Sequence, residues 1–295
     1  MKIPSVSRSG TRIVVTGSRG FIGRTLLPLL EEAGGEIRVF EGEIHQIATW
    51  DQSCEVVCHL AGMTKPRTHQ PAAAWLQVNT LGTLAVMEYC RRTGARCVLA
   101  SSASVYAPTC EAIRLGEQAV VNPPAHHGMS KLAAEELCRY YGTHHGVKTT
   151  ILRLFNVYGP GQPETFLLPY AIRQLVAQEP VVLQMPEAVR DWLYVSDAAR
   201  AFVLACMAPP SGVQVFNVGT GQGVCVRTVV ERLTQSLGVA ARIELPPEGS
   251  RPTDAVIADP SAIDAALAWQ AHVLLEQGLQ LTANASVRKP ASTPS

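Results

Sequence analysis

The stretch "RIVVTGSRGFIG", from Arg12 to Gly23, joins an apolar strand pattern to the start of a helical pattern through three glycines. Glycines in such a place permit a tight turn and let the backbone approach a pyrophosphate, while the first N–H groups and the dipole of the helix favour an anion. A plain strand-to-helix turn is the alternative. Because this turn follows the first strand and heads a series of βαβ units, it predicts dinucleotide binding.

Short apolar runs alternate with longer helical patterns through the first half of the chain. The helical patterns cover residues 21–33, 75–92 and 131–144, and the strand-like runs are "RIVVTG", "EIRVF", "EVVCHLAG", "RCVLASS" and "KTTILRLFNVYG". Unbroken apolar strands separated by helices indicate a parallel sheet covered on both faces. We therefore expect an α/β fold, with a doubly wound parallel sheet of the Rossmann type over residues 1–158.

From about Gly159 the sequence pattern changes to shorter elements with more Pro and Gly. Among them, "VQVFNVGTG" is the one clear strand. Residues 159–282 are expected to form a smaller C-terminal α/β substrate lobe, partly interleaved with the first domain. Such a lobe would lie over the carboxyl edge of the sheet, where open α/β folds bind their ligands. The segment 283–295, "ANASVRKPASTPS", is small, polar and Pro-bearing, and is expected to be disordered.

Composition and charge argue against several classes of protein. The 295 residues are 47% hydrophobic and 17% charged, with a formal net charge of +1, as in an ordinary soluble globular protein. No run of Lys or Arg is longer than a pair, so neither nucleic acid nor a membrane is expected as a partner. The N-terminus lacks the apolar run of a signal peptide, and no segment approaches the roughly 20 apolar residues of a membrane span. We expect a cytoplasmic protein.

Cysteine and histidine do not occur at the spacing of metal ligands. The eight cysteines are scattered without a C-x-x-C pair and fit apolar patterns, where free Cys packs as a small hydrophobe. The pairs at 126–127 and 144–145 have no carboxylate or cysteine at ligand spacing, so no metal site is predicted.

The end of the second expected strand carries the residues that bear on the choice of cofactor. Glu41 follows "EIRVF", where an acid binds the adenosine ribose and favours NAD. In "EGEIHQ", Glu43 and Ile44 are an alternative, as an acid and an apolar residue that flank the adenine. Arg19 favours NADP, because a cation there can meet a 2'-phosphate. NAD is therefore the expected cofactor, with NADP as the alternative.

Nine motifs occur along the chain in the order of one large enzyme family. They are "TGSRGFIG", "VVCHLAG", "VNTLGT", "SSASVY", "SKLAAEEL", "LRLFNVYGPG", "RDWLYVSDAARA", "FNVGTG" and "RPTDAVIADPS". From about Arg12 to Thr282 the chain resembles the extended short-chain dehydrogenase/reductase family, and within it the NAD-dependent epimerases of the UDP-galactose 4-epimerase type. The resemblance implies an enzyme with tightly held NAD, a nucleoside-diphosphate sugar as substrate and transient oxidation of a sugar hydroxyl. It also implies a homodimer, in which the helices holding Leu81 to Arg92 and Lys131 to His144 pack against their symmetry mates.

The resemblance also implies a cofactor site. Lys131 corresponds to the family's helix lysine, which holds the nicotinamide ribose and lowers the pKa of the neighbouring base, and Asn79 to an asparagine that orders the site. A solvated or capping polar residue is the alternative for each. The full set of expected cofactor residues is Gly17, Arg19, Gly20, Phe21, Ile22, Gly23, Glu41, Glu43, Ile44, Leu60, Ala61, Gly62, Asn79, Lys131 and Phe155.

In "SSASVY" the family's active-site hydroxyl falls on Ser102, which would donate to the oxygen that becomes a ketone. A serine that only caps a turn is the alternative. Sugar-nucleotide dehydratases of this family carry an Asp-Glu pair where Ala103 and Ser104 stand here, and decarboxylases have a carboxylate at the position of Ser104. The sequence therefore argues against both of these activities.

Substrate contacts are implied for Ser102, Ser104, Asn156, Arg190 and Arg251. Two arginines from separate segments suit a diphosphate, because each guanidinium can form paired, charge-assisted hydrogen bonds to its oxygens. Surface arginines without a ligand are the alternative. The family's "GDG" turn before the first arginine is replaced by "QMPEAV", so nucleotide recognition departs from the family pattern.

The family's catalytic tyrosine is replaced by His127, four residues before Lys131 and therefore on the same face of a helix. A tyrosine with a pKa near about 10 becomes a base beside cations, whereas a histidine near about 6.5 is kept neutral by them. Hydride transfer to the nicotinamide removes one positive charge, which makes a protonated imidazole easier to form. We therefore expect Ser102, His127 and Lys131 to be the catalytic residues.

Three functions follow from these residues. The leading one is an NAD-dependent epimerase, or a related 4-keto oxidoreductase, acting on a nucleotide sugar. The second is a lyase or isomerase that uses the histidine for proton chemistry, and the third is a non-catalytic protein that binds NAD. The intact substrate arginines favour the first two over the third.

Overall fold

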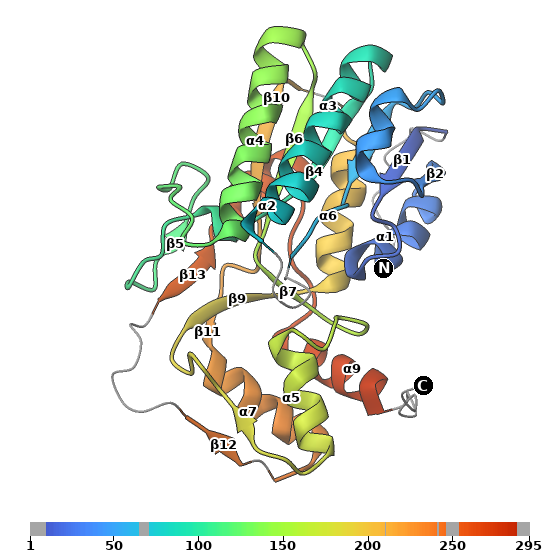
Figure 1. Ribbon diagram of the computed structural model, residues 1–295. Coiled ribbons are helices and arrows are strands. Elements are labelled where there is room, and N and C mark those ends of the chain that lie inside the picture. Colours follow the sequence, from blue (N-terminus) through green and yellow to red (C-terminus); the bar gives the residue numbers. More distant parts are fainter. Residues whose placement is uncertain (1–9, 65–70, 210, 241, 246–253, 288–295) are drawn as a thin grey trace.

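The computed structural model describes residues 10–64, 71–209, 211–240, 242–245 and 254–287, and its largest element is a six-stranded parallel sheet (Figure 1). The strand order is β10-β6-β4-β3-β1-β2. The strands are β1 (Arg12–Thr16), β2 (Glu36–Phe40), β3 (Val56–His59), β4 (Arg96–Ser102), β6 (Thr149–Leu154) and β10 (Val213–Val218). The expected α/β fold with a doubly wound parallel sheet is confirmed.

Both faces of the sheet are covered by helices because alternate strand residues point to opposite sides. In β1, Ile13 and Val15 pack in the core beneath α1 (Phe21–Glu32) and α6 (Val195–Met207). Val14, between them, packs in the core beneath α3 (Gly82–Thr93) and α4 (His126–His145).

Three short helical segments complete the large lobe. The 3-10 helix η1 (Ile44–Thr49) connects β2 to β3 along the chain. β2 itself is an edge strand of the sheet. The expected helix over 75–92 is divided into α2 (Ala72–Trp75), a π-helical turn η2 (Leu76–Leu81) and α3. Single π turns inside helices are frequent at functional sites.

A second, smaller group of elements lies at the carboxyl edge of the large sheet (Figure 1). Its strands are β5 (Arg114–Leu115), β7 (Asn156–Tyr158), β8 (Val181–Val182), β9 (Val189–Tyr194), β11 (Gly223–Cys225), β12 (Ile243–Glu244) and β13 (Ala255–Ala258). Its helices are α5 (Leu167–Val176), α7 (Val226–Leu237) and α9 (Leu275–Val287), whereas α8 (Ser261–Leu267) packs through Ile263 in the core of the large sheet. Tyr158, Leu168, Val229 and Leu279 belong to its hydrophobic core.

Two expectations about the second half need correction. The "VQVFNVGTG" strand, β10, pairs parallel with β6 and so extends the large sheet, while β9 and β13 form the centre of the smaller one. The sequence predicted disorder from residue 283 onward, and this start is too early. The helix α9 continues to Val287, and Ala283 is fully buried against the core of the smaller lobe. Residues 288–295 lie outside the described part of the chain.

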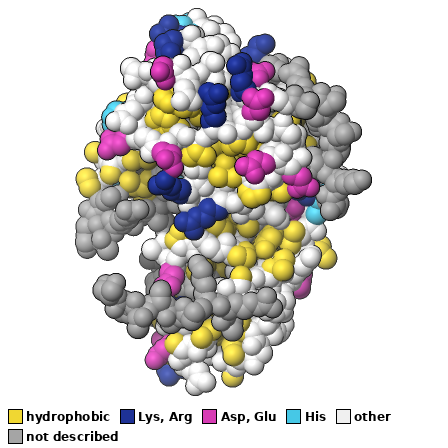
Figure 2. All heavy atoms as spheres, turned by 90° about the vertical axis from the view of Figure 1, so that its right-hand side faces the viewer, with side chains coloured by type: hydrophobic (Ala, Val, Ile, Leu, Met, Phe, Trp, Pro, Cys, Tyr) yellow, Lys and Arg dark blue, Asp and Glu magenta, His cyan; other side chains and the backbone are white. Residues whose placement is uncertain are grey.

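The surface carries charges of both signs. Figure 2 shows Lys and Arg side chains interspersed with Asp and Glu on one face, with hydrophobic patches between them. In the described part of the chain, no helix combines the length and apolar character that a membrane crossing requires.

Candidate functional site

The glycine turn after β1 is closed tightly against the segment that follows β3. Gly17 has φ +72°, and a Cβ there would lie 2.6 Å from the Ala61 backbone nitrogen. A Cβ on Gly23 would lie 2.5 Å from the Gly17 carbonyl oxygen. Gly20 is the N-cap of α1 and supplies no side-chain cap, so among the described residues no cap side chain occupies the first N–H groups of that helix. The residues therefore fit a dinucleotide diphosphate.

Replacement of Gly20 by aspartate is expected to abolish dinucleotide binding while keeping the fold. Aspartate is a good N-cap residue, so its carboxylate would accept the N–H groups that a diphosphate needs and would add a negative charge beside it. Gly20→Ala is the control, since it adds only a Cβ, 3.0 Å from the Gly17 oxygen. Isothermal titration with NAD and thermal melting measure both effects. Unchanged NAD affinity in Gly20→Asp would place the cofactor elsewhere.

The residues expected at the adenosine end lie around the end of β2. Arg19 and Glu41 form an exposed ion pair with 2.5 Å between Nη2 and Oε1. Glu43 is the N-cap of η1 and forms a capping box with Gln46. Ile44 packs against α3, where a Cβ on Gly82 would approach it to 2.8 Å. The acidic and basic residues that favour different cofactors thus lie in direct contact.

The residues expected at the nicotinamide end meet at the carboxyl ends of β3 and β4. A Cβ on Gly62 would lie 3.0 Å from both Asn79 Oδ1 and Lys131 Nζ. The Asn79 amide accepts from the Met63 N–H at 2.7 Å and donates to the Met63 carbonyl at 3.0 Å. Lys131 donates to the Ala100 carbonyl at 2.8 Å. The site thus brings together three segments that are far apart in the sequence.

Two other expected cofactor positions, Leu60 and Phe155, directly follow β3 and β6. Leu60 lies against Gly17, since a Cβ on that glycine would come within 2.8 Å of the Leu60 carbonyl carbon. The Phe155 side chain is buried in a hydrophobic cluster with Ala103 and Tyr106. Phe21 and Ile22 form the first turn of α1.

Ser102 ends β4 and is the N-cap of the 3-10 helix η3 (Ala103–Val105). Its Oγ accepts from the Ser104 N–H at 3.1 Å and donates to Ser104 Oγ at 3.1 Å. The capping role weighed from the sequence is therefore present. It uses a lone pair of the hydroxyl, so the O–H is free to donate to Ser104 or to a ligand.

His127 lies in the first turn of α4 and is held by contacts on several sides. Its ring packs against the Trp75 ring, with 5.5 Å between centroids. The next residue, Gly128, lies directly against the η3 turn, because a Cβ there would be 2.0 Å from the Ser104 carbonyl oxygen. The Nε2 atom of His127 is buried and has no hydrogen-bond partner among the described residues. An unsatisfied buried polar atom costs about 1–3 kcal/mol.

Burial sets the protonation of the two titratable groups on α4. Burial, and then the charge of Lys131, lower the pKa of His127 to about 4. Burial also lowers the pKa of Lys131 to about 8, although Glu135 raises it. At pH 7 the imidazole is therefore neutral and the lysine largely charged. The sequence predicts the direction for His127, but from charge alone and not from burial.

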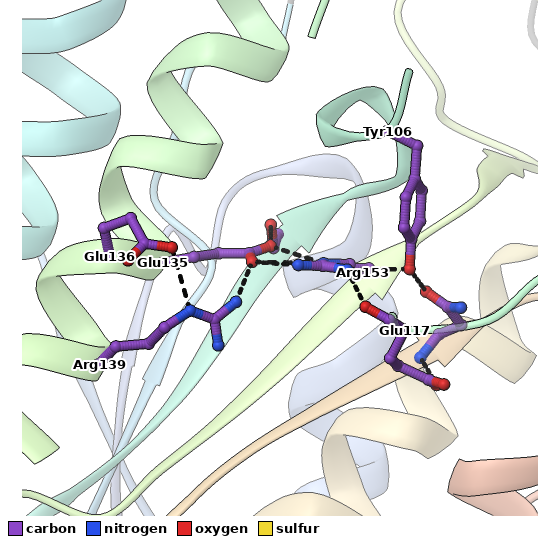
Figure 3. A network of polar contacts seen from close by, with 8 residues as sticks. Tyr106, Glu117, Glu135, Glu136, Arg139 and Arg153 are labelled. Carbon is purple, nitrogen blue, oxygen red and sulfur yellow. Dashed lines mark hydrogen bonds and ion pairs between the residues drawn. The ribbon is translucent and has the colours of Figure 1, made fainter. Parts of the chain in front are cut away.

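A buried ion-pair network fixes α4 against the sheet (Figure 3). Arg153 on β6 donates to Glu135 on α4, with 2.7 Å between Nη2 and Oε2, and both side chains are almost fully buried. Glu135 also accepts from Ser101 at 2.6 Å, and Arg153 donates to the Tyr106 hydroxyl at 2.9 Å. Arg139 reaches the same carboxylate at 3.1 Å. Sequence reasoning assigned no role to this network, although both ion-pair partners lie inside recognised motifs.

Two of the expected substrate residues, Asn156 and Arg190, lie on adjacent strands of the smaller lobe. Asn156 on β7 pairs in register with Trp192 on β9, which also carries Arg190. Both oxygens of Asp254 accept from Arg190 Nη2, at 2.8 and 2.9 Å. Arg251 lies outside the described residues.

The fold and the glycine turn are those of a dinucleotide-binding α/β protein. A family described as "NAD dependent epimerase/dehydratase family" matches residues 13–219. The chain belongs to this family, and its resemblance to extended short-chain dehydrogenases is confirmed.

Known proteins similar to this chain act on nucleotide sugars. GDP-6-deoxy-D-mannose reductase from Pseudomonas aeruginosa is 28% identical over 91% of this chain and 95% of that protein. UDP-glucose 4-epimerase from Azospirillum brasilense is 30% identical over 77% of this chain and 78% of that protein. The structure of MoeE5 in complex with UDP-glucuronic acid and NAD has a TM-score of 0.86 and 28% identity, and covers 94% of this chain and 99% of that chain.

Proposed function

We propose that this protein is an NAD-dependent epimerase, or a related 4-keto oxidoreductase, that acts on a nucleoside-diphosphate sugar. The observation that carries the proposal is the meeting of Gly62, Asn79 and Lys131 beside the glycine turn. Ser102 and His127 lie on the two segments that touch through the contact of Gly128 with Ser104. The related proteins that act on GDP- and UDP-sugars support this substrate class.

The chain's own residues would hold the sugar and move one proton. Ser102 donates its O–H to the reacting sugar oxygen and stabilises charge that develops there. Neutral His127 accepts the hydroxyl proton on the ring nitrogen that carries no hydrogen, and later returns it. Lys131 holds the nicotinamide ribose and disfavours the imidazolium. NAD, when bound, supplies the hydride acceptor for the sugar carbon.

Glu41 makes NAD the preferred cofactor over NADP in this proposal. Its carboxylate is suited to bind ribose hydroxyls, and it repels a 2'-phosphate. The ion pair with Arg19 at 2.5 Å offsets the cation that would otherwise attract that phosphate.

The function is tested by mass spectrometry of the purified protein, followed by incubation with UDP-glucose, UDP-glucuronic acid and GDP-6-deoxy-D-mannose. We expect NAD to co-purify and at least one sugar to be converted to an epimer or a keto product. A protein that neither holds NAD nor changes or binds any of these nucleotides would favour the non-catalytic alternative.

We also propose a homodimer through α3, α4 and the turn before α3. Leu81, Met129 and Tyr140 are exposed hydrophobic side chains on these elements. A second copy packed on this face would bury them. Light scattering at micromolar concentration is expected to give twice the 31.7 kDa of one chain. A mass of one chain would contradict the dimer.

A further inference from the structure

Trp75 is a buried residue for which the function proposed above has no role. It ends α2, 52 positions before His127 in the sequence, and only 6% of its surface is exposed. Its ring and the His127 ring lie 5.5 Å apart between centroids and are inclined by 48°. This is a tilted aromatic contact, a geometry that gives one ring a preferred orientation against the other.

The helical segment that begins at Trp75 also holds the backbone of His127. Asn79, four residues later, donates to Ser130 Oγ at 2.8 Å, and Ser130 Oγ donates to the His127 carbonyl at 2.8 Å. Thr80 donates to the Ser130 carbonyl at 3.0 Å. One segment therefore holds both the ring and the main chain of His127.

An imidazole needs such support more than the family's tyrosine does. Two nitrogens at different places on the ring mean that a rotation about the Cβ–Cγ bond changes which atom faces the substrate. The contact with Trp75 restricts that rotation, and the indole also covers the ring from water. The charged group that acts on His127 is Lys131, one helical turn later, so rotation would also change the distance of each nitrogen from this cation.

We propose that Trp75 is a positioning residue: its indole holds the His127 imidazole in one orientation and so fixes which ring nitrogen faces the reacting oxygen. This inference rests on the catalytic role proposed for His127. It concerns a residue on a separate helix, and it predicts effects on the histidine that are measurable without turnover.

The test compares Trp75→Leu with Trp75→Phe, which keeps an aromatic ring. NMR titration of the His127 ring signals in the protein without substrate is the first readout. In Trp75→Leu the pKa of His127 is expected to rise from about 4 towards its ordinary value, because water reaches the ring. Trp75→Phe is expected to keep most of the depression. An unchanged His127 titration in folded Trp75→Leu would overturn the proposal.

Kinetics supply the second readout. Trp75→Leu is expected to lower kcat on the order of 10–100-fold, with the NAD affinity unchanged, since a small misplacement of a catalytic group is costly. In a His127→Phe background the same change should have no further effect on kcat, because the group that it positions is gone. An equal loss in both backgrounds would indicate a general packing defect and reject the positioning role. If the wild type turned over no nucleotide sugar, the proposed function would fail, whereas the titration would still test the contact.

Discussion

Replacement of His127 by phenylalanine is expected to lower turnover by about 10²–10⁴-fold, the usual contribution of a positioned acid-base group. Phenylalanine keeps a ring of similar breadth against Trp75 and removes both nitrogens, including the buried Nε2 that has no partner among the described residues. The affinities for NAD and for the sugar nucleotide are expected to stay within about twofold, because the glycine turn and Arg190 are untouched.

The neighbouring His126→Phe variant is the matched control. His126 is exposed and directly precedes His127, so its replacement makes the same chemical change one position away. Steady-state kinetics with both variants separate a catalytic role from a general effect on α4. Wild-type turnover in His127→Phe would reject the assignment and leave Ser102, or another group, to handle the proton.

The dependence of stability on pH has a definite sign. The pKa of His127 is lowered to about 4 in the folded protein, so the imidazole should remain a neutral acceptor until the pH falls through that value. The unfolded chain takes up this proton near its ordinary pKa of about 6.5. Stability should therefore fall as the pH is lowered from about 6.5 towards 4, because the unfolded state binds more protons there. His127→Phe should reduce that slope in urea unfolding measured across the same range.

Loss of the buried carboxylate at position 135 is expected to produce the largest change in stability. In Glu135→Gln the Arg153 guanidinium, 2% exposed, would stay buried opposite a neutral amide. Removing one partner of a buried ion pair costs about 3–5 kcal/mol in the free energy of unfolding. Because the network holds α4 on β6, we also expect weaker NAD binding through the displaced Lys131.

Glu136→Gln is the matched control for this change. Glu136 is exposed and pairs only with Arg139 in the network, at 3.1 Å. Its replacement is expected to change stability by at most about 1 kcal/mol, as for other surface ion pairs. Equal unfolding midpoints for Glu135→Gln and Glu136→Gln in urea would show that the buried pair does not hold the helix.

Local sequence patterns predicted the large sheet because its strands are unbroken apolar runs next to glycine or serine. The patterns could not place β9 or β13, since "VRDWLY" mixes charged and apolar residues and "AVIA" is very short. The position of β10 depends on pairing with β6, which no local pattern encodes. The expected start of the disordered segment at residue 283 was wrong because small residues such as Ala283 pack well in a core although they look like a linker.

The candidate site shows the same division. Gly17, Ser102 and Lys131 were found because each occurs in a motif with fixed spacing. The pairing of Glu135 with Arg153 and the contact of Trp75 with His127 join residues that are 18 and 52 positions apart, so only the fold reveals them. Burial as the main cause of the low His127 pKa was likewise invisible in the sequence.

Transfer of hydrogen from sugar to cofactor is measured most directly with nucleotide sugars that carry deuterium at C4. The NAD-loaded protein would be mixed with UDP-glucose, UDP-glucuronic acid or GDP-6-deoxy-D-mannose labelled in this way. The reaction would be quenched in base during a single turnover, because reduced nicotinamide decomposes in acid, and the nicotinamide would be analysed by mass spectrometry. We expect deuterium on the nicotinamide with at least one sugar for the wild type and for His126→Phe, and none for His127→Phe. Absence of deuterium for the wild type with all three sugars, or its transfer at the wild-type rate in His127→Phe, would contradict oxidoreduction through this histidine.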